Sequence, residues 1–569
     1  MSTSRRPLQS SEILASRVPY SERIYAIGPF AGRVSFSSQQ RRAFSLVCDI
    51  DNDLRTGGDR NGLDGKDVAI VGSGIAGITA ALTVAALKGR AYIFEQTPET
   101  SGKLMSTIRD AIHRDAHPTL NFWPQEDIEP FTRFPVLNWH EGTCADVASA
   151  IANQFEEFLD GDIGARIEIV NGCKIQTVTH DDGKWTLDQI FEDYADKRHV
   201  GYAYDVVLLA TGFGEEVTSV TANSPSYWDA RNNPVSAIAL SARLPIDHYI
   251  VSGTGDGGLI EALHLLLKSR RPGNIDDDTI AFLLDDSFRD EISKVERTAF
   301  LYRADRLLHE PKLNPDKIAD DIASYMWNEY NRIVSKKVPQ RAIDRIKQDR
   351  SEVRKVTLLG RRPFPMELSS SPYHRILTTI AIRQQWIEYI QTKKTEVSEA
   401  KGTVKVGSGK SVSVITLHDI VVTPKSGGAR ASKLFPASFY LERHGYNSPL
   451  EDLKGKPSQY VKEMRLQQRL YADQDELKDR YADELAKIFG VATPTDPLAY
   501  FKFHKRKIQG YFWDRFNLDL QFGDGGTKRF VARGPKAAGV KAAVPRRLFG
   551  FEVRHDSRPL EEFDDAGLS

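Results

Sequence analysis

The chain has 569 residues, 40% of them hydrophobic and 27% charged, which is more than one hydrophobic core holds and predicts two or three domains. Lys and Arg together number 77, as do Asp and Glu, so no global field favours nucleic acid or a membrane surface. The longest apolar runs are interrupted by Gly, Ser and Thr and predict no membrane span. A small-molecule substrate is therefore the default expectation.

The three cysteines are Cys48, Cys144 and Cys173, and no two of them form a CxxC or CxxxxC pair. This spacing argues against a disulfide scaffold, a zinc site and a redox-active dithiol. It favours a reducing compartment, and we predict a cytoplasmic location. The first 45 residues are rich in Ser and Arg and poor in acids, which leaves an organellar transit peptide as the alternative.

The first predicted elements in chain order form a β-α-β unit. A helix-like pattern from Phe36 and a Gly- and Asp-rich loop at Asn52–Lys66 come first. The unit itself consists of a strand at Val68–Val71, a helix at Ile75–Leu87 and a strand at Ala91–Gln96. Such an opening predicts a parallel sheet with helices on its faces.

A GxGxxG motif lies between the first strand and its helix. Gly72 allows a tight turn, Gly74 allows a pyrophosphate to come close, and Gly77 allows the helix to pack against the strand. An acid about 20 residues further on is expected to hold a ribose hydroxyl, and Glu95 stands there. The predicted dinucleotide contacts here are Gly72, Ser73, Gly74, Ile75, Ala76, Gly77, Glu95 and Gln96.

The pattern then continues with a hairpin and a buried strand. Cys173–Leu187 reads as the hairpin, with its turn at Asp182-Gly183. The run Val206–Glu216 reads as a buried strand that ends in the small residues Ala210, Thr211 and Gly212. We expect these three residues to pass close to a cofactor.

A second strand, glycine turn and helix begin at His248. Gly253, Gly255 and Gly258 repeat the anion-binding pattern, although Asp256 inside the turn is expected to repel a pyrophosphate unless it points away or meets a cation. The next strand of this unit is predicted at Thr279–Asp286. Asp285 and Asp286 at its end favour NADH, whereas Arg270 and Arg271 argue for NADPH.

The remainder of the chain is less regular. A charged, helix-patterned insertion is expected at about 290–350, and strands are expected from Val356 and at Ser411–Pro424. A charged helix is predicted over Tyr460–Gly490, and a basic tail follows it, either as a docking strand or as a partly ordered extension.

These patterns predict an α/β fold with four parts. They are an N-terminal extension and helix at 1–65, a Rossmann-like FAD-binding domain at 66–245, a second dinucleotide-binding-type domain with the helical insertion at 246–430, and a C-terminal helical and basic extension at 431–569.

Three motifs in this order resemble the flavoprotein superfamily with two dinucleotide-binding domains. They are VGSGIAG with Glu95, VVLLATGFGEE from Val206, and VSGTGDGG from Val251. The resemblance implies that the first motif binds FAD and, in reductases of this kind, that the second accepts NAD(P)H. Ser101-Gly102-Lys103 is similar to the glycine doublet and basic residue of amine-oxidase-like flavoproteins, so Gly102 and Lys103 are candidates for the flavin pyrophosphate. A solvent-exposed loop is the alternative.

Aromatic and His residues gather in the loops after the first unit. His117, Trp123 and His140 are the candidates for lining the flavin, because aromatic faces stack and His exchanges protons near neutral pH. Purely structural roles are the alternative for each of them. No acid-His helix such as HExxH is present, so no metal site is predicted.

The predicted function is that of an FAD-dependent oxidoreductase reduced by NAD(P)H, with an unknown substrate. Two alternatives stay open. One is a regulatory dinucleotide-binding protein that contacts a protein partner through the helical insertion or the tail. The other is an amine or amino-acid oxidase that needs no nicotinamide nucleotide.

Overall fold

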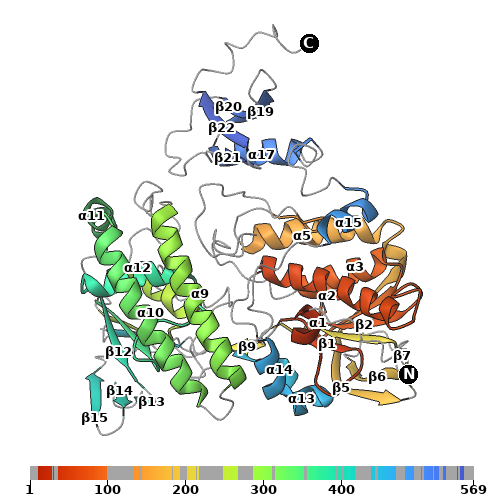
Figure 1. The fold of residues 1–569 in the computed structure, drawn as a ribbon, viewed down its shortest axis with the longest axis horizontal. Helices are drawn as coiled ribbons and strands as arrows, with labels where there is room; N and C mark the ends of the chain where they lie inside the picture. The colour runs from red at the N-terminus through yellow and green to blue at the C-terminus, as the bar shows by residue number, and fades with distance from the viewer. Residues whose placement is uncertain are drawn as a thin grey trace, which may run out of the picture.

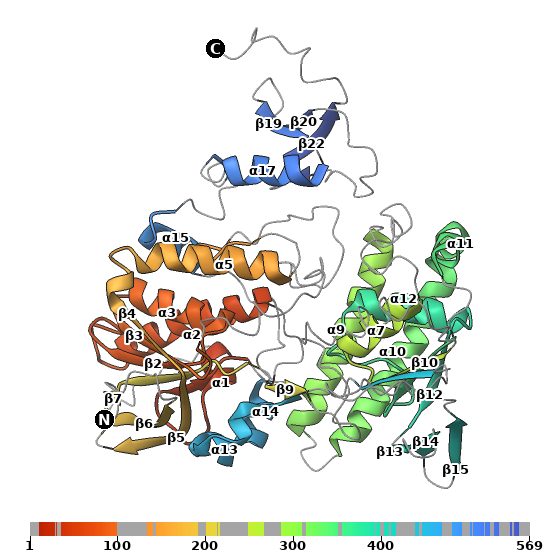
Figure 2. The same cartoon turned by 180° about the vertical axis from the view of Figure 1, so that it is seen from behind.

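The computed structural model (Figures 1 and 2) describes residues 11–28, 30, 36–98, 134–139, 144–181, 183–191, 201–212, 214–216, 248–266, 286–309, 314–350, 355–392, 394–398, 403–408, 411–416, 438–442, 446–468, 481–491, 501–502, 505–516, 518–523, 529–533, 547–548 and 551–556. Within these ranges, no helix combines the length and the apolar character needed to cross a membrane.

A parallel sheet in the order β1-β8-β2-β3-β4 forms the centre of the first lobe, drawn from red to yellow in Figure 1. Its strands are β1 (Ile24–Ala26), β2 (Asp67–Val71), β3 (Arg90–Glu95), β4 (Ile167–Asn171) and β8 (Val206–Leu209). The helices of this lobe include α1 (Ser11–Ser16), α2 (Phe36–Thr56), α3 (Ile75–Ala86) and α5 (Cys144–Leu159), with a 3-10 turn at Gly164–Arg166. The predicted strand-helix-strand unit is therefore confirmed. Because β1 pairs with β8, the sheet also includes residues that precede the domain start expected at residue 66.

Side chains of this sheet alternate between two apolar cores. Val68 and Ile70 belong to the core shared with α2, α3 and α5, whereas Ala69 and Val71 belong to the core on the other face. That other face is covered by an antiparallel sheet in the order β18-β5-β6-β7. Its strands are β5 (Cys173–Asp181), β6 (Lys184–Phe191), β7 (Ala203–Tyr204) and β18 (Lys454–Gly455), the last of which runs parallel to β5. The predicted hairpin is confirmed, and Gly183 takes the positive φ of 78° in its turn.

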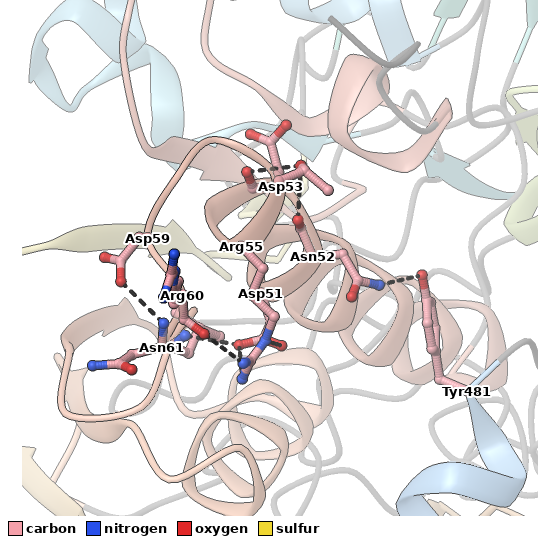
Figure 3. A network of polar contacts seen from close by, with 10 residues as sticks. Asp51, Asn52, Asp53, Arg55, Asp59, Arg60, Asn61 and Tyr481 are labelled. Atoms are coloured by element: carbon pink, nitrogen blue, oxygen red, sulfur yellow. Dashed lines mark hydrogen bonds and ion pairs between the residues drawn. The ribbon is translucent and has the colours of Figure 1, made fainter.

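Helix α2 extends into the loop expected at Asn52–Lys66, because it ends only at Thr56. The expectation of a loop was wrong for those first residues. Asp51 Oδ2 accepts from Arg55 Nε at 2.7 Å (Figure 3). Its Oδ1 accepts from the backbone N–H of Leu63 at 2.7 Å, which ties the remaining loop to α2. Asp51, which lies inside α2, therefore holds the loop after the helix against its last turns.

The same end of α2 is tied to a segment from late in the chain. Tyr481 accepts a hydrogen bond from Asn52 Nδ2 at 3.2 Å (Figure 3). It also donates one to Asp49 Oδ1 at 2.5 Å. Tyr481 directly precedes α15 (Ala482–Ile488). The charged segment predicted as one helix over Tyr460–Gly490 contains α14 (Val461–Gln467) and α15, and residues 469–480 lie outside the described part.

A second parallel sheet, in the order β12-β11-β10-β16, forms the other lobe. Its strands are β10 (His248–Ser252), β11 (Lys355–Gly360), β12 (Ile387–Gln391) and β16 (Ser438–Glu442). Its helices include α7 (Asp256–Leu266), α9 (Asp286–His309), α10 (Pro315–Lys337), α11 (Gln340–Asp349) and α12 (Pro372–Arg383), drawn in green in Figure 2. Helices α9, α10 and α11 occupy the place of the expected helical insertion.

The neighbours of β10 come from later parts of the chain. Both edges of β10 are occupied, one by β11 and the other by β16. Asp286 opens helix α9, and Asp285 lies outside the described residues. Residues 279–285 of the predicted strand lie outside the described part of the chain, so that strand stays a prediction, apart from Asp286. Helices α9, α10 and α11 separate β10 from its neighbour β11.

The remaining elements are small sheets and C-terminal pieces. An antiparallel sheet joins β13 (Lys394–Ser398), β14 (Thr403–Ser408) and β15 (Ser411–Thr416), and a short pair joins β9 (Glu215–Glu216) to β17 (Tyr446–Asn447). A 3-10 turn at Pro449–Glu451 and α13 (Lys456–Gln459) precede α14. The C-terminal sheet holds β19 (Asp519–Gly523), β20 (Arg529–Arg533), β21 (Arg547–Leu548) and β22 (Phe551–Asp556), and α17 (Lys505–Phe516) lies beside it (Figure 1). The basic tail thus contributes strands to a sheet of its own.

A buried ion pair holds the helical insertion to the second sheet. Arg375 on α12 is fully buried, and its Nη2 donates to Glu296 Oε2 of α9 at 2.6 Å. Tyr330 of α10 donates to the other oxygen of Glu296 at 2.6 Å. Arg375 Nη1 also donates to the carbonyl oxygen of Glu367. These contacts join α9, α10, α12 and the loop before α12.

We predict that Glu296→Ala lowers the free energy of unfolding by about 3–5 kcal/mol, because it leaves the Arg375 charge buried without its carboxylate. Glu329→Ala removes a partly exposed ion pair with Arg332 and should cost less than about 1 kcal/mol. Urea denaturation of both variants measures the difference. Equal losses would contradict the importance of the buried pair.

Candidate functional site

The first glycine turn is packed tightly against its own strand and against β8. Gly72 has a φ of 105°, and a Cβ placed on it would lie 2.5 Å from the carbonyl oxygen of Ala210. A Cβ on Gly77 would lie 1.9 Å from the carbonyl oxygen of Gly72. Neither position accepts a side chain, so these two glycines set the distance between helix α3 and strand β2.

Gly74, the middle glycine, has a different environment. A Cβ on Gly74 would meet no described atom within 4 Å. Gly74 is the N-cap of α3 and makes no side-chain capping hydrogen bond, and the first turn of α3 carries no acid. The N-terminus of α3 therefore offers backbone N–H groups and positive dipole charge toward open space, which suits a phosphate.

Glu95 holds this turn to the end of the adjacent strand. Its Oε2 accepts from the backbone N–H of Ser73 at 2.9 Å and from Ser73 Oγ at 2.8 Å. Its Oε1 accepts from the N–H and the hydroxyl of Thr97, both at 2.9 Å. The carboxylate thus lies beside the glycine turn, as expected for a ribose acid, and a ribose hydroxyl would replace one of the two side-chain hydroxyl donors.

The segment after β8 lies against the same turn. Ala210 donates its backbone N–H to the carbonyl oxygen of Val71 at 2.9 Å. Thr211 Oγ1 is buried and has no hydrogen-bond partner among the described residues. Gly212 has a φ of 66°, and a Cβ there would meet no described atom within 4 Å. An unpartnered buried hydroxyl and open space beside two glycines fit a bound dinucleotide at this place.

The second glycine turn repeats the geometry of the first. Gly253 has a φ of 128°, and a Cβ on Gly258 would lie 2.0 Å from the carbonyl oxygen of Gly253. A Cβ on Gly255 would meet no described atom within 4 Å, like one on Gly74. In both turns, therefore, the third glycine leaves no room for a Cβ, whereas a Cβ on the middle glycine would meet no described atom.

Asp256 opens helix α7 in this turn, and its carboxylate contacts the start of α12. Its Oδ1 lies 2.6 Å from His374 Nδ1 and accepts from the backbone N–H of Ser371 at 2.9 Å. Burial alone would raise the pKa of Asp256, but the charge and hydrogen bond of His374, the Ser371 N–H and the charge of Arg375 hold that pKa below its ordinary value. The Asp256 carboxylate is thus held by hydrogen-bonding groups at the start of α12 and lies near the charge of Arg375, so it does not stand uncompensated in the turn.

The sheet register shows which residue of the second lobe corresponds to Glu95. Val71 pairs with Phe94 ahead of Glu95, and Ser252 pairs with Leu359 ahead of Gly360. The first glycine of each turn donates to the paired carbonyl oxygen, of Phe94 or of Leu359, at 2.8 Å in both cases. Gly360 therefore takes the position that Glu95 takes in the first lobe, and Arg361 and Arg362 follow it.

The two arginines after Gly360 differ in their surroundings. Arg361 is exposed and has no ion-pair partner for its guanidinium within the described ranges. Arg362 Nη1 lies 3.0 Å from Asp316 Oδ1 and 3.2 Å from Asp320 Oδ1, both on α10. These two carboxylates raise the pKa of Arg362 against the opposing effect of burial. Arg361 is therefore the cation available to an anionic ligand at this strand end.

Sequence reasoning missed Arg361, Glu367 and His374. The run from Val356 was recognised as a strand but was not connected with the second glycine turn. The signal that would have found Arg361 is the match between two apolar strands, one ending in Glu95 and the other in Gly360-Arg361. Glu367, whose Oε1 accepts from Thr254 Oγ1 at 2.5 Å, left no spacing signal.

Several predicted site residues lie outside the described part of the chain. They are Gly102, Lys103, His117, Trp123 and His140, and their roles stay predictions. Ile75 and Ala76 are buried in the first core, and Gln96 is exposed. Trp139, which precedes His140, is fully buried and donates its indole N–H to Gln40 of α2 at 2.7 Å.

The two cysteines whose side chains are described are buried. Cys48 is buried in α2. Cys173 is buried in β5, and desolvation raises the pKa of its thiol to about 12, so it stays protonated at neutral pH. These two thiols belong to the cores on opposite faces of the first sheet. Among the described residues, no group of His, Cys, Asp and Glu could hold a metal ion.

Residues 66–323 match the protein family described as pyridine nucleotide-disulphide oxidoreductase. The match covers somewhat less than half of the chain and includes both glycine turns. Members of this family use FAD and NAD(P)H, and the chain is accordingly an FAD-dependent oxidoreductase. No curated protein sequence matches the chain.

Solved structures give weaker likenesses. Bacillithiol disulfide reductase from Staphylococcus aureus is 11% identical, with a TM-score of 0.33 over 69% of this chain and 80% of that one. Thioredoxin reductase from Lactococcus lactis is 12% identical, with a TM-score of 0.30 over 66% of this chain and 77% of that one. Likenesses at these scores carry no argument about the chemistry of this chain.

We predict that Gly74→Ala raises the dissociation constant for FAD at least about tenfold, because the new methyl group enters the space beside the α3 N-terminus. The free energy of unfolding of the flavin-free protein should change by less than about 1 kcal/mol, since that space holds no atom of the described residues. Fluorescence titration with FAD and urea denaturation measure the two effects. Gly161→Ala, whose Cβ would make only an ordinary contact at 3.6 Å, is the control. Unchanged FAD affinity in Gly74→Ala would contradict a cofactor at this turn.

Proposed function

Because residues 66–323 belong to the superfamily of FAD- and NAD(P)-binding flavoprotein oxidoreductases, we propose that the enzyme holds FAD at its first glycine turn and NADPH at its second. The observation that carries this proposal is the equivalence of the two turns. Each has a closed glycine pair and an open middle glycine, but Glu95 follows one strand and Gly360-Arg361 follows the other.

At the first turn, the α3 N-terminus and Gly74 receive the pyrophosphate of FAD, and Glu95 accepts from a ribose hydroxyl. Thr211 Oγ1, which has no partner within the described ranges, donates to or accepts from the same ligand. FAD, when bound, supplies the two-electron chemistry of hydride acceptance, and the protein supplies position and exclusion of water.

At the second turn, the α7 N-terminus and Gly255 receive the pyrophosphate of the nicotinamide nucleotide. A carboxylate after the neighbouring strand would select a free ribose hydroxyl, whereas a guanidinium suits a 2′-phosphate. Gly360 supplies no carboxylate, and exposed Arg361 supplies the guanidinium. This arrangement favours NADPH over NADH, in place of the NADH preference first inferred from Asp285 and Asp286.

The electron acceptor is proposed to be a small molecule other than a disulfide. Reduction of a disulfide through the protein needs a nearby cysteine pair, and Cys48, Cys144 and Cys173 provide no such pair in sequence. The high pKa of the Cys173 thiol supports the same conclusion. An oxidase, a monooxygenase or a simple flavin reductase remains within the proposal, and a cytoplasmic location is proposed with it.

We predict that Arg361→Ala raises the KM for NADPH by about ten- to a hundredfold, as expected when a charged hydrogen bond to phosphate is lost. The KM for NADH should stay the same, because NADH has no 2′-phosphate. Lys355→Ala, at the opposite end of β11, is the matched control. Equal weakening of both nucleotides by Arg361→Ala would contradict its assignment to the 2′-phosphate.

We further predict that a variant with Cys48, Cys144 and Cys173 all replaced by Ala keeps NADPH-dependent bleaching of the flavin absorbance in the absence of air. Its turnover with O₂ or a quinone should match that of the starting protein, once folding is verified by circular dichroism. A folded variant that takes up FAD but loses turnover would show that a thiol participates. A starting protein that binds FAD but is not bleached by NADPH would contradict the proposed donor.

A further inference from the structure

The second glycine turn carries a carboxylate that the first lacks. In the aligned turns, Asp256 takes the position of Ile75, the first residue of the helix. A carboxylate there lies at the helix end where a pyrophosphate is expected, and two such anions repel each other. The Asp256 side chain is 36% exposed, so the protein does not shield it fully from a ligand in that space.

The partner of this carboxylate comes from α12. His374 is 1% exposed, and its Nδ1 lies 2.6 Å from Asp256 Oδ1. The backbone N–H of Ser371, the N-cap of α12, donates to the same oxygen. Both donors on Asp256 thus come from the start of α12, and they hold its Oδ1 toward that helix.

Contacts of the neighbouring residue Arg375 fix the position of His374. Its neighbour Arg375 is buried and binds Glu296 of the helical insertion and the carbonyl oxygen of Glu367. The Glu367 side chain accepts from Thr254, inside the second turn. The start of α12 and the loop before it therefore form hydrogen bonds with two residues of the glycine turn, Thr254 and Asp256.

We propose that His374 is a positioning residue for the nicotinamide nucleotide, because its contact with Asp256 Oδ1 holds that carboxylate toward α12 and so allows a pyrophosphate to bind at the α7 N-terminus. This inference rests on the proposed NADPH site at the second turn. Its consequence is specific: removal of His374 alone harms binding, because it leaves the Asp256 carboxylate without this contact. Replacing both Asp256 and His374 with neutral amides restores binding.

A double-mutant cycle tests this relation in the FAD-loaded full-length protein. His374→Gln should raise the dissociation constant for NADP⁺ at least about tenfold. Asp256→Asn should leave it unchanged or lower it, and Asp256→Asn combined with His374→Gln should return it to within about threefold of the starting protein. FAD content and thermal midpoint, measured on each variant, report any general damage to the fold.

His309→Gln is the matched control, because His309 also pairs with an aspartate, Asp305, but at 3.7 Å on the exposed surface of α9. It should leave NADP⁺ binding unchanged. If the double variant binds as weakly as His374→Gln, the pair has only a structural role and the proposal is wrong. If His374→Gln binds NADP⁺ normally, the proposal is likewise wrong. Failure of the starting protein to bind NADP⁺ at all would instead reject the NADPH site itself.

Discussion

The close approach of a helix to the strand before it is the constraint on which both lobes depend. At Gly77 and at Gly258, a single Cβ would lie 2.0 Å or less from the carbonyl oxygen of the first glycine in the turn. Only because these positions are glycine can α3 and α7 begin directly above the ends of β2 and β10. That placement points each helix N-terminus at the end of its parallel sheet, which is where an anion gains most from it.

The two lobes differ in what surrounds this shared turn. In the first, Glu95 supports the turn through Ser73, and the turn itself carries no acid. In the second, support comes through Thr254 from Glu367, and an acid within the turn contacts His374. In the proposed assignment, the first lobe presents the Glu95 carboxylate to a ribose, and the second presents Arg361. Two turns with the same backbone geometry therefore favour two different dinucleotides.

The first unit could be predicted from sequence because everything that defines it is local. The strand, the glycines, the helix and Glu95 follow one another within one short segment, and the structure confirms the elements. In the second lobe, α9, α10 and α11 separate β10 from β11, so the local pattern predicted a strand at Thr279–Asp286 and did not indicate β11 as the neighbour. Once β11 is recognised as the neighbour, Arg361 follows from the register alone.

Tertiary contacts such as the one between Asp256 and His374 could not be predicted. These residues lie 118 positions apart, and only the packing of α12 against α7 brings them together. The sequence correctly identified Asp256 as an anomaly in a phosphate turn, since charge alone makes it one. It did not identify the group that holds this carboxylate, because a lone His within a helical pattern carries no spacing signal. The flavin-facing candidates His117, Trp123 and His140 remain predictions.

The central claim is that the chain holds two different dinucleotides at two separate turns. It is tested most directly by titrating the FAD-loaded protein with NADP⁺ in a calorimeter and measuring the flavin that stays bound. We predict that one NADP⁺ binds per chain while the flavin is fully retained. Release of FAD as NADP⁺ binds would show a single shared site, and absence of binding would show that the second turn holds no nicotinamide nucleotide; either result would contradict the account.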